Sequence, residues 1–258
     1  MVYGEMGKEA LKWATQFEFG IDPDSMPPQV VITPLKVEEC FKQFQATIRN
    51  MGLINKRVGS GFMVSKRKKQ ALFCEGGIGA SSFADASYIL CHLENVKEIL
   101  FVGTGGGLGE NVESADIHMP SSCIRLDKVL EIFLPLDASA KADVELTKKL
   151  KSHVEHEVRD LGVRIHNGIH ATVPFFLSET RDLLKNLQKQ GALSVDMELS
   201  VLYALANHFH KKAAGIIRIG DLPLKGLPAW KSRSYKRELK DEVHKRILRA
   251  ILNYIFTP

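Results

Sequence analysis

Two short acidic segments of the chain stand where strands and helices are expected to meet, which is where α/β proteins commonly place their chemistry. Val195-Asp196-Met197-Glu198 opens a segment with helical periodicity, and Asp221 follows the predicted strand 213–219. A carboxylate can accept hydrogen bonds from sugar hydroxyls and stabilise a cationic transition state, and a carboxyl group with a raised pKa can donate a proton. The same acids can also begin a helix or a turn. The residues alone leave both interpretations open.

Two glycine-rich segments follow predicted strands. Residues 75–82 (Glu-Gly-Gly-Ile-Gly-Ala-Ser-Ser) precede a helix with apolar positions at 86, 89, 90 and 93, and residues 103–107 (Gly-Thr-Gly-Gly-Gly) follow the strand 99–102. We expect both to be turns at which the backbone approaches a ligand closely. Neither matches the full spacing of the dinucleotide fingerprint.

Other chemistries lack their usual motifs. The nine histidines form no H-x-x-x-H or H-E-x-x-H pair, so no metal site is predicted. No G-x-S-x-G elbow is present. The widely spaced cysteines at 40, 74, 91 and 123 predict free thiols.

Composition indicates a folded soluble protein. Of the 258 residues, 45% are hydrophobic and 25% charged, and no stretch approaches the ~20 apolar residues of a membrane span. Residues 1–20 mix acidic and basic residues where a signal peptide needs an apolar run, so we expect a cytoplasmic protein that binds no membrane. The net charge is +5, but the densest basic run, 66–69, lies between two short strands and predicts a hairpin turn; no nucleic-acid partner is expected.

Strands and helices alternate, which predicts one α/β domain over residues 29–258 after an N-terminal extension, residues 1–28. The extension is expected to hold a short helix with Leu11, Ala14 and Phe17 on one face. A strand at 29–33 precedes a helix from about Val37 that carries Cys40, Phe41, Phe44 and Ile48. Further helices are predicted from Ser194, with a stripe of Met197, Val201, Leu205 and Phe209, and over 239–255 at the C-terminus.

The order of these segments is more specific than any one of them. Gly-Phe at 61–62, the two glycine-rich segments, Val195-Asp196-Met197-Glu198 and Ile219-Gly220-Asp221 together resemble the nucleoside phosphorylases of the purine nucleoside and uridine phosphorylase type. The resemblance covers about residues 29–256. It implies a mixed central sheet that is partly closed into a barrel and flanked by helices. It also implies a homo-oligomer (a dimer, trimer or hexamer) with active sites at subunit contacts.

The resemblance assigns roles to the nucleoside contacts. Glu198 matches the glutamate that accepts ribose hydroxyls, Met197 the methionine that packs on the sugar, and Asp221 the general acid for a purine base. Phe175 and Phe176 match the aromatic pair that covers the base, with core packing as their alternative, and Gly106 is expected beside the substrate. Glu179 and Arg181 stand where uridine phosphorylases use glutamine and arginine, so a pyrimidine stays open.

The phosphate contacts match less well. Arg57 matches an arginine supplied by the neighbouring subunit, Thr104 a hydroxyl donor and Gly79 a glycine turn, while Lys36 replaces an arginine. Phe101 stands where a strand arginine is expected. Each lost charge-assisted bond removes roughly 1.5–3 kcal/mol of phosphate binding.

These matches predict a purine nucleoside phosphorylase-like enzyme that uses inorganic phosphate as co-substrate and no further cofactor. Phe101 leaves two alternatives open. One is a nucleosidase that uses water, with Glu38 or Glu39 as an imperfect match for the water-activating acid. The other is a family member with weak catalysis that binds a nucleoside.

Overall fold

The computed structural model describes residues 7–41 and 43–257. Over these residues nine strands form one mixed sheet, in the order β2 (Ile54–Val58), β3 (Gly61–Lys66), β4 (Lys69–Glu75), β1 (Gln29–Thr33), β5 (Glu98–Gly107), β8 (Ala192–Asp196), β7 (Ile165–Thr172), β6 (Ile117–Arg125) and β9 (Lys212–Asp221). β9 also pairs with β5. Strands β5, β8, β7, β6 and β9 therefore close into a barrel, and β1–β4 extend it, which confirms the predicted fold.

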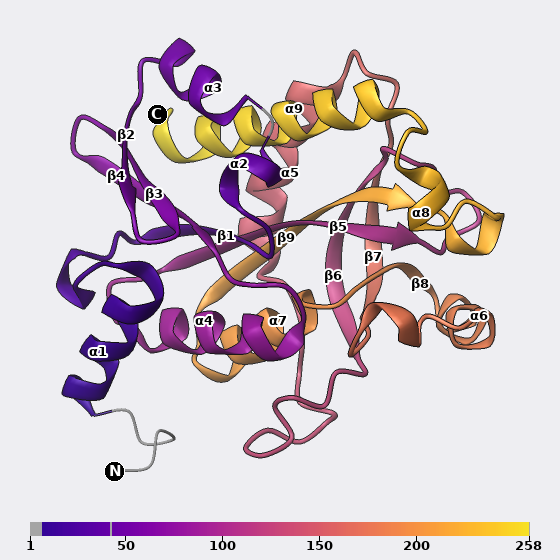
Figure 1. Cartoon of the computed structure of the whole chain (residues 1–258), viewed down its shortest axis with the longest axis horizontal. Coiled ribbons are helices and arrows are strands. Elements are labelled where there is room, and N and C mark those ends of the chain that lie inside the picture. Colours follow the sequence, from indigo (N-terminus) through magenta and orange to yellow (C-terminus); the bar gives the residue numbers. More distant parts are fainter. Residues whose placement is uncertain (1–6, 42, 258) are drawn as a thin grey trace.

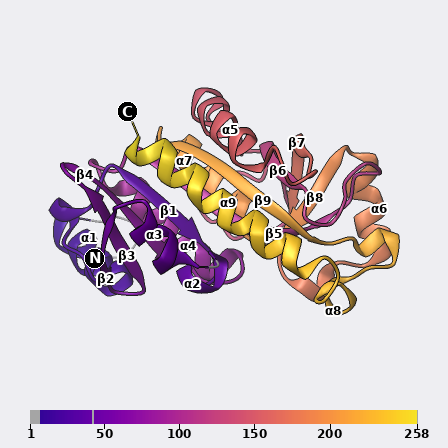
Figure 2. The same ribbon diagram turned by 90° about the horizontal axis from the view of Figure 1, so that it is seen from above.

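Helices cover both faces of the sheet (Figure 1). In that view α9 (Arg237–Phe256) and α3 (Phe44–Asn50) lie above the sheet, and α4 (Ala80–His92) and α7 (Leu199–His208) lie below it. Figure 2 shows α9 running along the molecule over β5 and β9, with α5 (Val144–Val158) beside it. The remaining helices are α1 (Lys8–Phe19), α2 (Val37–Cys40), α6 (Arg181–Lys189) and α8 (Ala229–Ser232).

The alternation of β5 separates two cores. Ile99 and Phe101 pack with residues of α4 and α7, whereas Leu100 and Val102 pack with residues of α5 and α9. Successive side chains of a strand point to opposite faces, so this division follows directly from the apolar run 99–102. β5 pairs with β1 and β9 along its two edges, and helices cover both of its faces, which explains why the run is apolar throughout.

The basic run lies where the sequence predicted it. Lys66 and Lys69 end and begin the antiparallel strands β3 and β4, and Arg67 in the turn has a φ of 55°. All four basic side chains of 66–69 are exposed. The four cysteines are free thiols; Cys40, Cys74 and Cys91 are buried, as expected of structural thiols, whereas Cys123 is partly exposed.

The predicted turn at 103–107 is wrong, because these residues continue β5. Gly106 and Gly107 pair with Val195 and Ser194 of β8. The missing side chains are what allows the strand to continue: a Cβ on Gly105 would lie 2.5 Å from the carbonyl oxygen of Val195. The glycines serve close strand packing here.

Two predicted helices also have different bounds. Ala192–Asp196 form β8, and α7 begins only at Leu199, so Met197 is not part of a helix. The predicted helix from Val37 is divided into α2 and α3, with Gln43 at a φ of 59° before α3. Cys40, Phe41, Phe44 and Ile48 are nonetheless all buried.

The N-terminal segment packs on the domain. Phe19, Ile21 and Met26 belong to the same core cluster as residues of α4. Leu11 and Ala14 are partly buried against that cluster, but Phe17 is 75% exposed and stacks on Trp13, so its predicted place on the buried face is wrong. Residues 1–6 of the predicted extension lie outside the described residues. Among the described helices, none has the length and apolar character needed to cross a membrane.

Candidate active site

Glu198 lies between the end of β8 and the start of α7, with only 4% of its surface exposed. Its Oε1 accepts a hydrogen bond of 2.7 Å from the backbone N–H of Gly79, and its Oε2 accepts one of 3.3 Å from Met197. Gly79 has a φ of 87° and directly precedes α4. The glutamate therefore joins the glycine turn before α4 to the start of α7.

Asp196, and not Glu198, caps α7. The Asp196 carboxylate accepts hydrogen bonds from the backbone N–H groups of Leu199 at 3.0 Å and Glu198 at 3.2 Å. Capping by Asp196 satisfies N–H groups that the first turn of a helix leaves open. The structural alternative considered for both acids thus applies to Asp196 and leaves the Glu198 side chain for another use.

Burial, and then the neighbouring charge of Asp196, raise the pKa of Glu198 to about 8. The hydrogen bonds from Gly79 and Met197 favour the ionised form and oppose this shift. The carboxyl group is therefore mostly neutral at pH 7 in the empty site. Ribose hydroxyls that donate to it would favour ionisation.

A buried polar chain extends from Asp196 into the barrel. Thr172 Oγ1 donates to Asp196 Oδ1 at 2.7 Å, and His170 Nε2 lies 2.8 Å from the same oxygen without hydrogen-bond alignment. Ser194 Oγ lies 2.7 Å from His170 Nδ1 and 2.6 Å from His118 Nδ1. Burial, and then the charge of His170, lower the pKa of His118 well below its ordinary value, so its ring is neutral. These contacts hold Asp196, and through it the backbone of Glu198, in one position.

Asp221 is the last residue of β9 and lies opposite Gly106 of β5. A Cβ on Gly106 would lie 3.2 Å from Val195 and 3.4 Å from Pro223, so glycine is what this crowded position accepts without displacement. Burial raises the pKa of Asp221 to about 6, while the charges of Lys240 and Arg218 lower it. A carboxyl group with such a pKa can donate a proton near neutral pH.

Two cavities meet at Asp221. The larger, which we call the basic cavity, has a volume of about 700 Å³ and is lined by Thr104, Arg218, Gly220, Asp221, Ala229, Ser232, Arg233, Ser234, Arg237, Lys240 and Asp241. The second, the aromatic cavity, has a volume of about 460 Å³ and is lined by Phe176, Leu177, Glu179, Arg181, Leu184, Asp221, Pro223, Leu224, Gly226, Pro228, Ala229, Trp230 and Lys231. Asp221 can therefore act on a ligand in either space.

The predicted base contacts divide between the aromatic cavity and the surface. Phe176, Glu179 and Arg181 line the cavity, whereas Phe175 is 58% exposed and is not among its lining residues. Burial, and then the charge of Asp221, raise the pKa of Glu179 to about 7. A partly neutral Glu179 can both donate and accept a hydrogen bond at the edge of a heterocycle.

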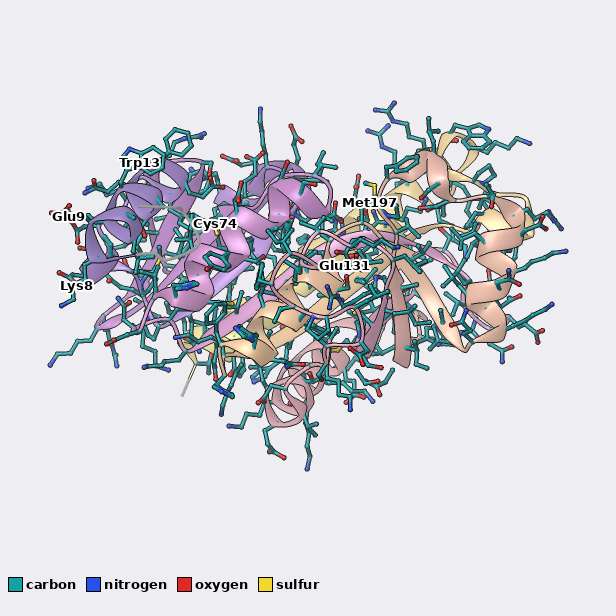
Figure 3. All side chains as sticks on the ribbon, turned by 90° about the horizontal axis from the view of Figure 1, so that it is seen from below. Lys8, Glu9, Trp13, Cys74, Glu131 and Met197 are labelled. Atoms are coloured by element: carbon teal, nitrogen blue, oxygen red, sulfur yellow. The ribbon has the colours of Figure 1, made fainter. Side chains whose placement is uncertain are left out.

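Met197 lies on the connection between β8 and α7. In Figure 3 it is labelled between the purple N-terminal elements and the orange elements on the opposite side of the molecule. Its side chain is half-buried and packs against a small core cluster that includes Val195 and Leu184.

The four predicted phosphate contacts are not gathered at one point of this chain. Thr104 lines the basic cavity and Gly79 binds Glu198. Lys36 and Arg57 are exposed, and Arg57 lies 3.8 Å from Glu38 and over the ring of Phe62. Arg57 is thus accessible to another subunit, as its predicted role requires.

Phe101 occupies the core. It is 1% exposed and packs edge to face on Phe83 at 5.5 Å between ring centroids. A Cβ on Gly103 would lie 2.7 Å from the Phe101 ring. At the position of the expected strand arginine the structure therefore has a buried apolar side chain.

The sequence reasoning missed Arg218, Arg233, Arg237 and Lys240 of the basic cavity. They come from β9, the segment after α8 and the start of α9, so no local spacing connects them. One signal was available: Lys236 and Arg237 stand at the N-terminal end of a helix, where basic residues oppose the helix dipole.

Comparison with known proteins places these features in a family. A family model described as "Phosphorylase superfamily" matches residues 33–255. The purine nucleoside phosphorylase DeoD-type of Buchnera aphidicola subsp. Schizaphis graminum is 30% identical over 158 residues, which cover 60% of this chain and 64% of that protein, just under two thirds of its length. Its counterpart in Bacillus cytotoxicus is 26% identical over 162 residues, covering 62% and 67% of the two chains.

Solved structures share the whole fold. A uridine phosphorylase from Vibrio fischeri ES114 superposes with a TM-score of 0.72 over 92% of this chain and 95% of its own, at 15% identity. An AMP nucleosidase from Bacteroides thetaiotaomicron VPI-5482 gives a TM-score of 0.69 over 96% and 98%, at 17% identity. Identities this low show the fold alone.

Proposed function

Because this chain belongs to the phosphorylase superfamily, we propose that it is an enzyme that cleaves the N-glycosidic bond of a purine nucleoside, with inorganic phosphate as acceptor. The observation that carries the proposal is the position of Asp221, a half-buried carboxyl group with a pKa of about 6 between an aromatic and a basic cavity. The products would be the free base and ribose 1-phosphate.

The two acids meet the two electronic demands of the reaction. As the bond breaks, negative charge develops on the departing base and positive charge on the ribose. Asp221 would donate a proton to the base at N7, and Glu198 would accept the ribose hydroxyls and stabilise the cation. Met197, next to Glu198 in the chain, would pack on the sugar.

The aromatic cavity supports a flat base. Phe176 and Trp230 contribute apolar rings, and Asp221 supplies the acid that the family resemblance assigns to a purine base. Relatives from Buchnera and Bacillus carry the name purine nucleoside phosphorylase, whereas one structural neighbour is a uridine phosphorylase. Glu179 and Arg181 line the same cavity, so a panel of substrates must include uridine.

Hydrolysis is the second candidate, and the burial of Phe101 favours it. A buried phenyl ring at the strand position removes one phosphate ligand of the family pattern. Water is then the competing acceptor, and one structural neighbour is named an AMP nucleosidase. Glu38 is exposed and contacts Arg57. Among the described residues, no contact joins it to Asp221 or Glu198.

Product analysis decides between the acceptors. The purified protein is incubated with adenosine, inosine, guanosine and uridine, with and without phosphate, and sugar products are separated chromatographically. Ribose 1-phosphate that forms only with phosphate supports phosphorolysis, and free ribose in both conditions supports hydrolysis. Asp221→Asn is the control for adventitious activity. If neither ribose 1-phosphate nor free ribose forms from any of the nucleosides, the protein is not an enzyme of this class, and the nucleoside-binding alternative is favoured.

We also propose that the enzyme acts in the cytoplasm as a homo-oligomer in which Arg57 reaches the site of a neighbouring subunit. The exposure of Arg57 on β2 supports this arrangement. Mass measurement in solution tests it, because a strictly monomeric active protein would contradict it. Arg57→Ala should raise the KM for phosphate more than the KM for the nucleoside, since a guanidinium contacts the anion.

A further inference from the structure

We propose that the basic cavity binds a phosphate group through side chains that the family resemblance does not assign: Arg218, Arg233, Arg237 and Lys240. The inference rests on the proposed function for the reaction in which the phosphate takes part. Binding of the anion itself is a separate property that can be measured without any reaction.

The charge of the cavity is the first argument. Four cationic side chains line it, against the two carboxylates of Asp221 and Asp241. Among the described residues, none of these four cations takes part in an ion pair within 4.0 Å. The two carboxylates balance the four positive charges only in part, and an anion with two charges would relieve the remaining repulsion.

The hydrogen bonds of Arg218 hold its guanidinium in place without neutralising it. Arg218 Nε donates to His244 Nε2 at 2.9 Å, and Nη1 donates to the carbonyl oxygen of Ile219 at 3.2 Å. Burial lowers the pKa of Arg218 to about 10. A positioned guanidinium in partly desolvated surroundings is the group that binds phosphate most strongly.

Lys240 is positioned in a similar way. Its side chain is buried, and Nζ donates a hydrogen bond of 2.8 Å to the carbonyl oxygen of Ser232. Burial lowers its pKa, and the charge of Arg218 lowers it further. An anion between the two cations would offset both effects.

The start of α9 is the second, independent argument. This 20-residue helix begins at Arg237, and its N-cap, Lys236, has a φ of 51° and provides no side-chain cap. Lys236 and Arg237 oppose the helix dipole at this end, whereas Glu238 in the first turn complements it. The same N-terminus is favourable for an anion, whose charge complements both the dipole and the side chains.

Thr104 connects the basic cavity to the predicted phosphate contacts. Thr104, one of the predicted phosphate contacts, lies opposite Arg218 in the pairing of β5 and β9 and lines the cavity with it. Arg218 thus provides a cation beside Thr104 on the α9 face of the sheet, whereas Phe101 lies on the opposite face among residues of α4 and α7. The same chemistry suits free phosphate or the phosphate ester of a nucleoside monophosphate.

Calorimetric titration with inorganic phosphate tests the site. Arg233 and Arg237 are exposed, so Arg233→Gln/Arg237→Gln removes two cavity charges without disturbing the core. Arg49→Gln/Arg159→Gln is the matched control, because both arginines are exposed, outside the cavity and outside the ion pairs of the described residues. The cavity variant should raise the Kd for phosphate at least about tenfold, and the control less than about twofold.

Steady-state kinetics distinguishes the two sources of the phosphate group. If free phosphate occupies the cavity, the cavity variant raises the KM for phosphate with an unphosphorylated purine nucleoside. If an ester occupies it, the variant raises the KM for a purine nucleoside 5′-monophosphate and leaves that of the parent nucleoside unchanged. Equal binding of phosphate by wild type, cavity variant and control overturns the inference.

The two proposals fail separately. If Arg233→Gln/Arg237→Gln cleaves nucleosides with unchanged KM values and binds phosphate as the wild type does, the basic cavity is not a phosphate site. The proposed function then stays intact. Phosphate binding that the cavity variant abolishes, in a protein that cleaves no nucleoside, supports the site and refutes the proposed function.

Discussion

The pKa values of Asp221 and Glu198 predict an unusual pH dependence, which Asp221→Asn should simplify. The proposed mechanism requires Asp221 to be protonated and Glu198 to be ionised, but burial raises their pKa values to about 6 and about 8. Each acid is therefore mostly in the wrong state at pH 7. Only about one tenth of each is in the required form, so about 1% of the free enzyme is competent.

The profile of kcat/KM follows from these fractions. Below about pH 6 the activity rises with pH because Glu198 ionises, between about 6 and 8 the two effects cancel, and above about 8 it falls because Asp221 loses its proton. Asp221→Asn removes the second requirement. The kcat/KM of the variant should rise until about pH 8 and then stay level, so that the midpoint of the rise moves upward by about two pH units.

The assay measures kcat/KM from pH 5 to pH 10 by base release. Loss of the proton donor should lower the kcat/KM for ordinary purine nucleosides about 10²- to 10⁴-fold. A purine nucleoside alkylated at N7, whose base leaves without protonation, should be spared and keeps the variant measurable. A variant that still loses activity above about pH 8, or whose rise stays at about pH 6, would refute the assignment of Asp221.

Three further substitutions test the site and its supports. Glu198→Gln should lower kcat at least about 10²-fold because the negative charge is lost. Since the buried carboxyl is largely neutral, the melting temperature should be almost unchanged. A variant with the kcat of the wild type would exclude Glu198 from the active site. Tyr203→Phe should lower the free energy of unfolding by about 1–3 kcal/mol in urea denaturation, because the buried hydroxyl donates to Pro120 and accepts from Gly215; an unchanged midpoint would contradict these bonds. Phe101→Ala should cost about 3–5 kcal/mol in the same measurement through the cavity it leaves, and a loss below about 1 kcal/mol would contradict its burial.

Much of the fold was predictable because the hydrophobic pattern is regular. The stripe of 239–255 predicted α9, and the basic run 66–69 predicted the hairpin of β3 and β4. The hydrophobic pattern gave a wrong boundary where residues of a strand also fit the spacing of a helix. The spacing of four from Met197 to Phe209 continued past the real start of α7 and concealed the five-residue strand β8.

The candidate site was predictable only in its local parts. Glu198 and Asp221 each stand in a short motif, so their neighbours in sequence are enough to propose them as site residues. The basic cavity depends on how residues 229–240 return over the end of β9, which is a tertiary property. The glycines at 103–107 were assigned to a turn because glycine permits both turns and close strand packing, and only the partner strand β8 decides between them.

The pairing of β5 with β9 has a consequence for the order in which the molecule folds. It joins residues 98–106 to residues 212–221, so the ring closes only after most of the chain has been synthesised and arranged. Contacts between residues so far apart in sequence have a high entropic cost of loop closure and form slowly. Asp221 and both cavities lie at the end of this seam. In refolding experiments, substrate turnover should therefore return later than helical circular dichroism, because a chain with its helices formed but its seam open has no site.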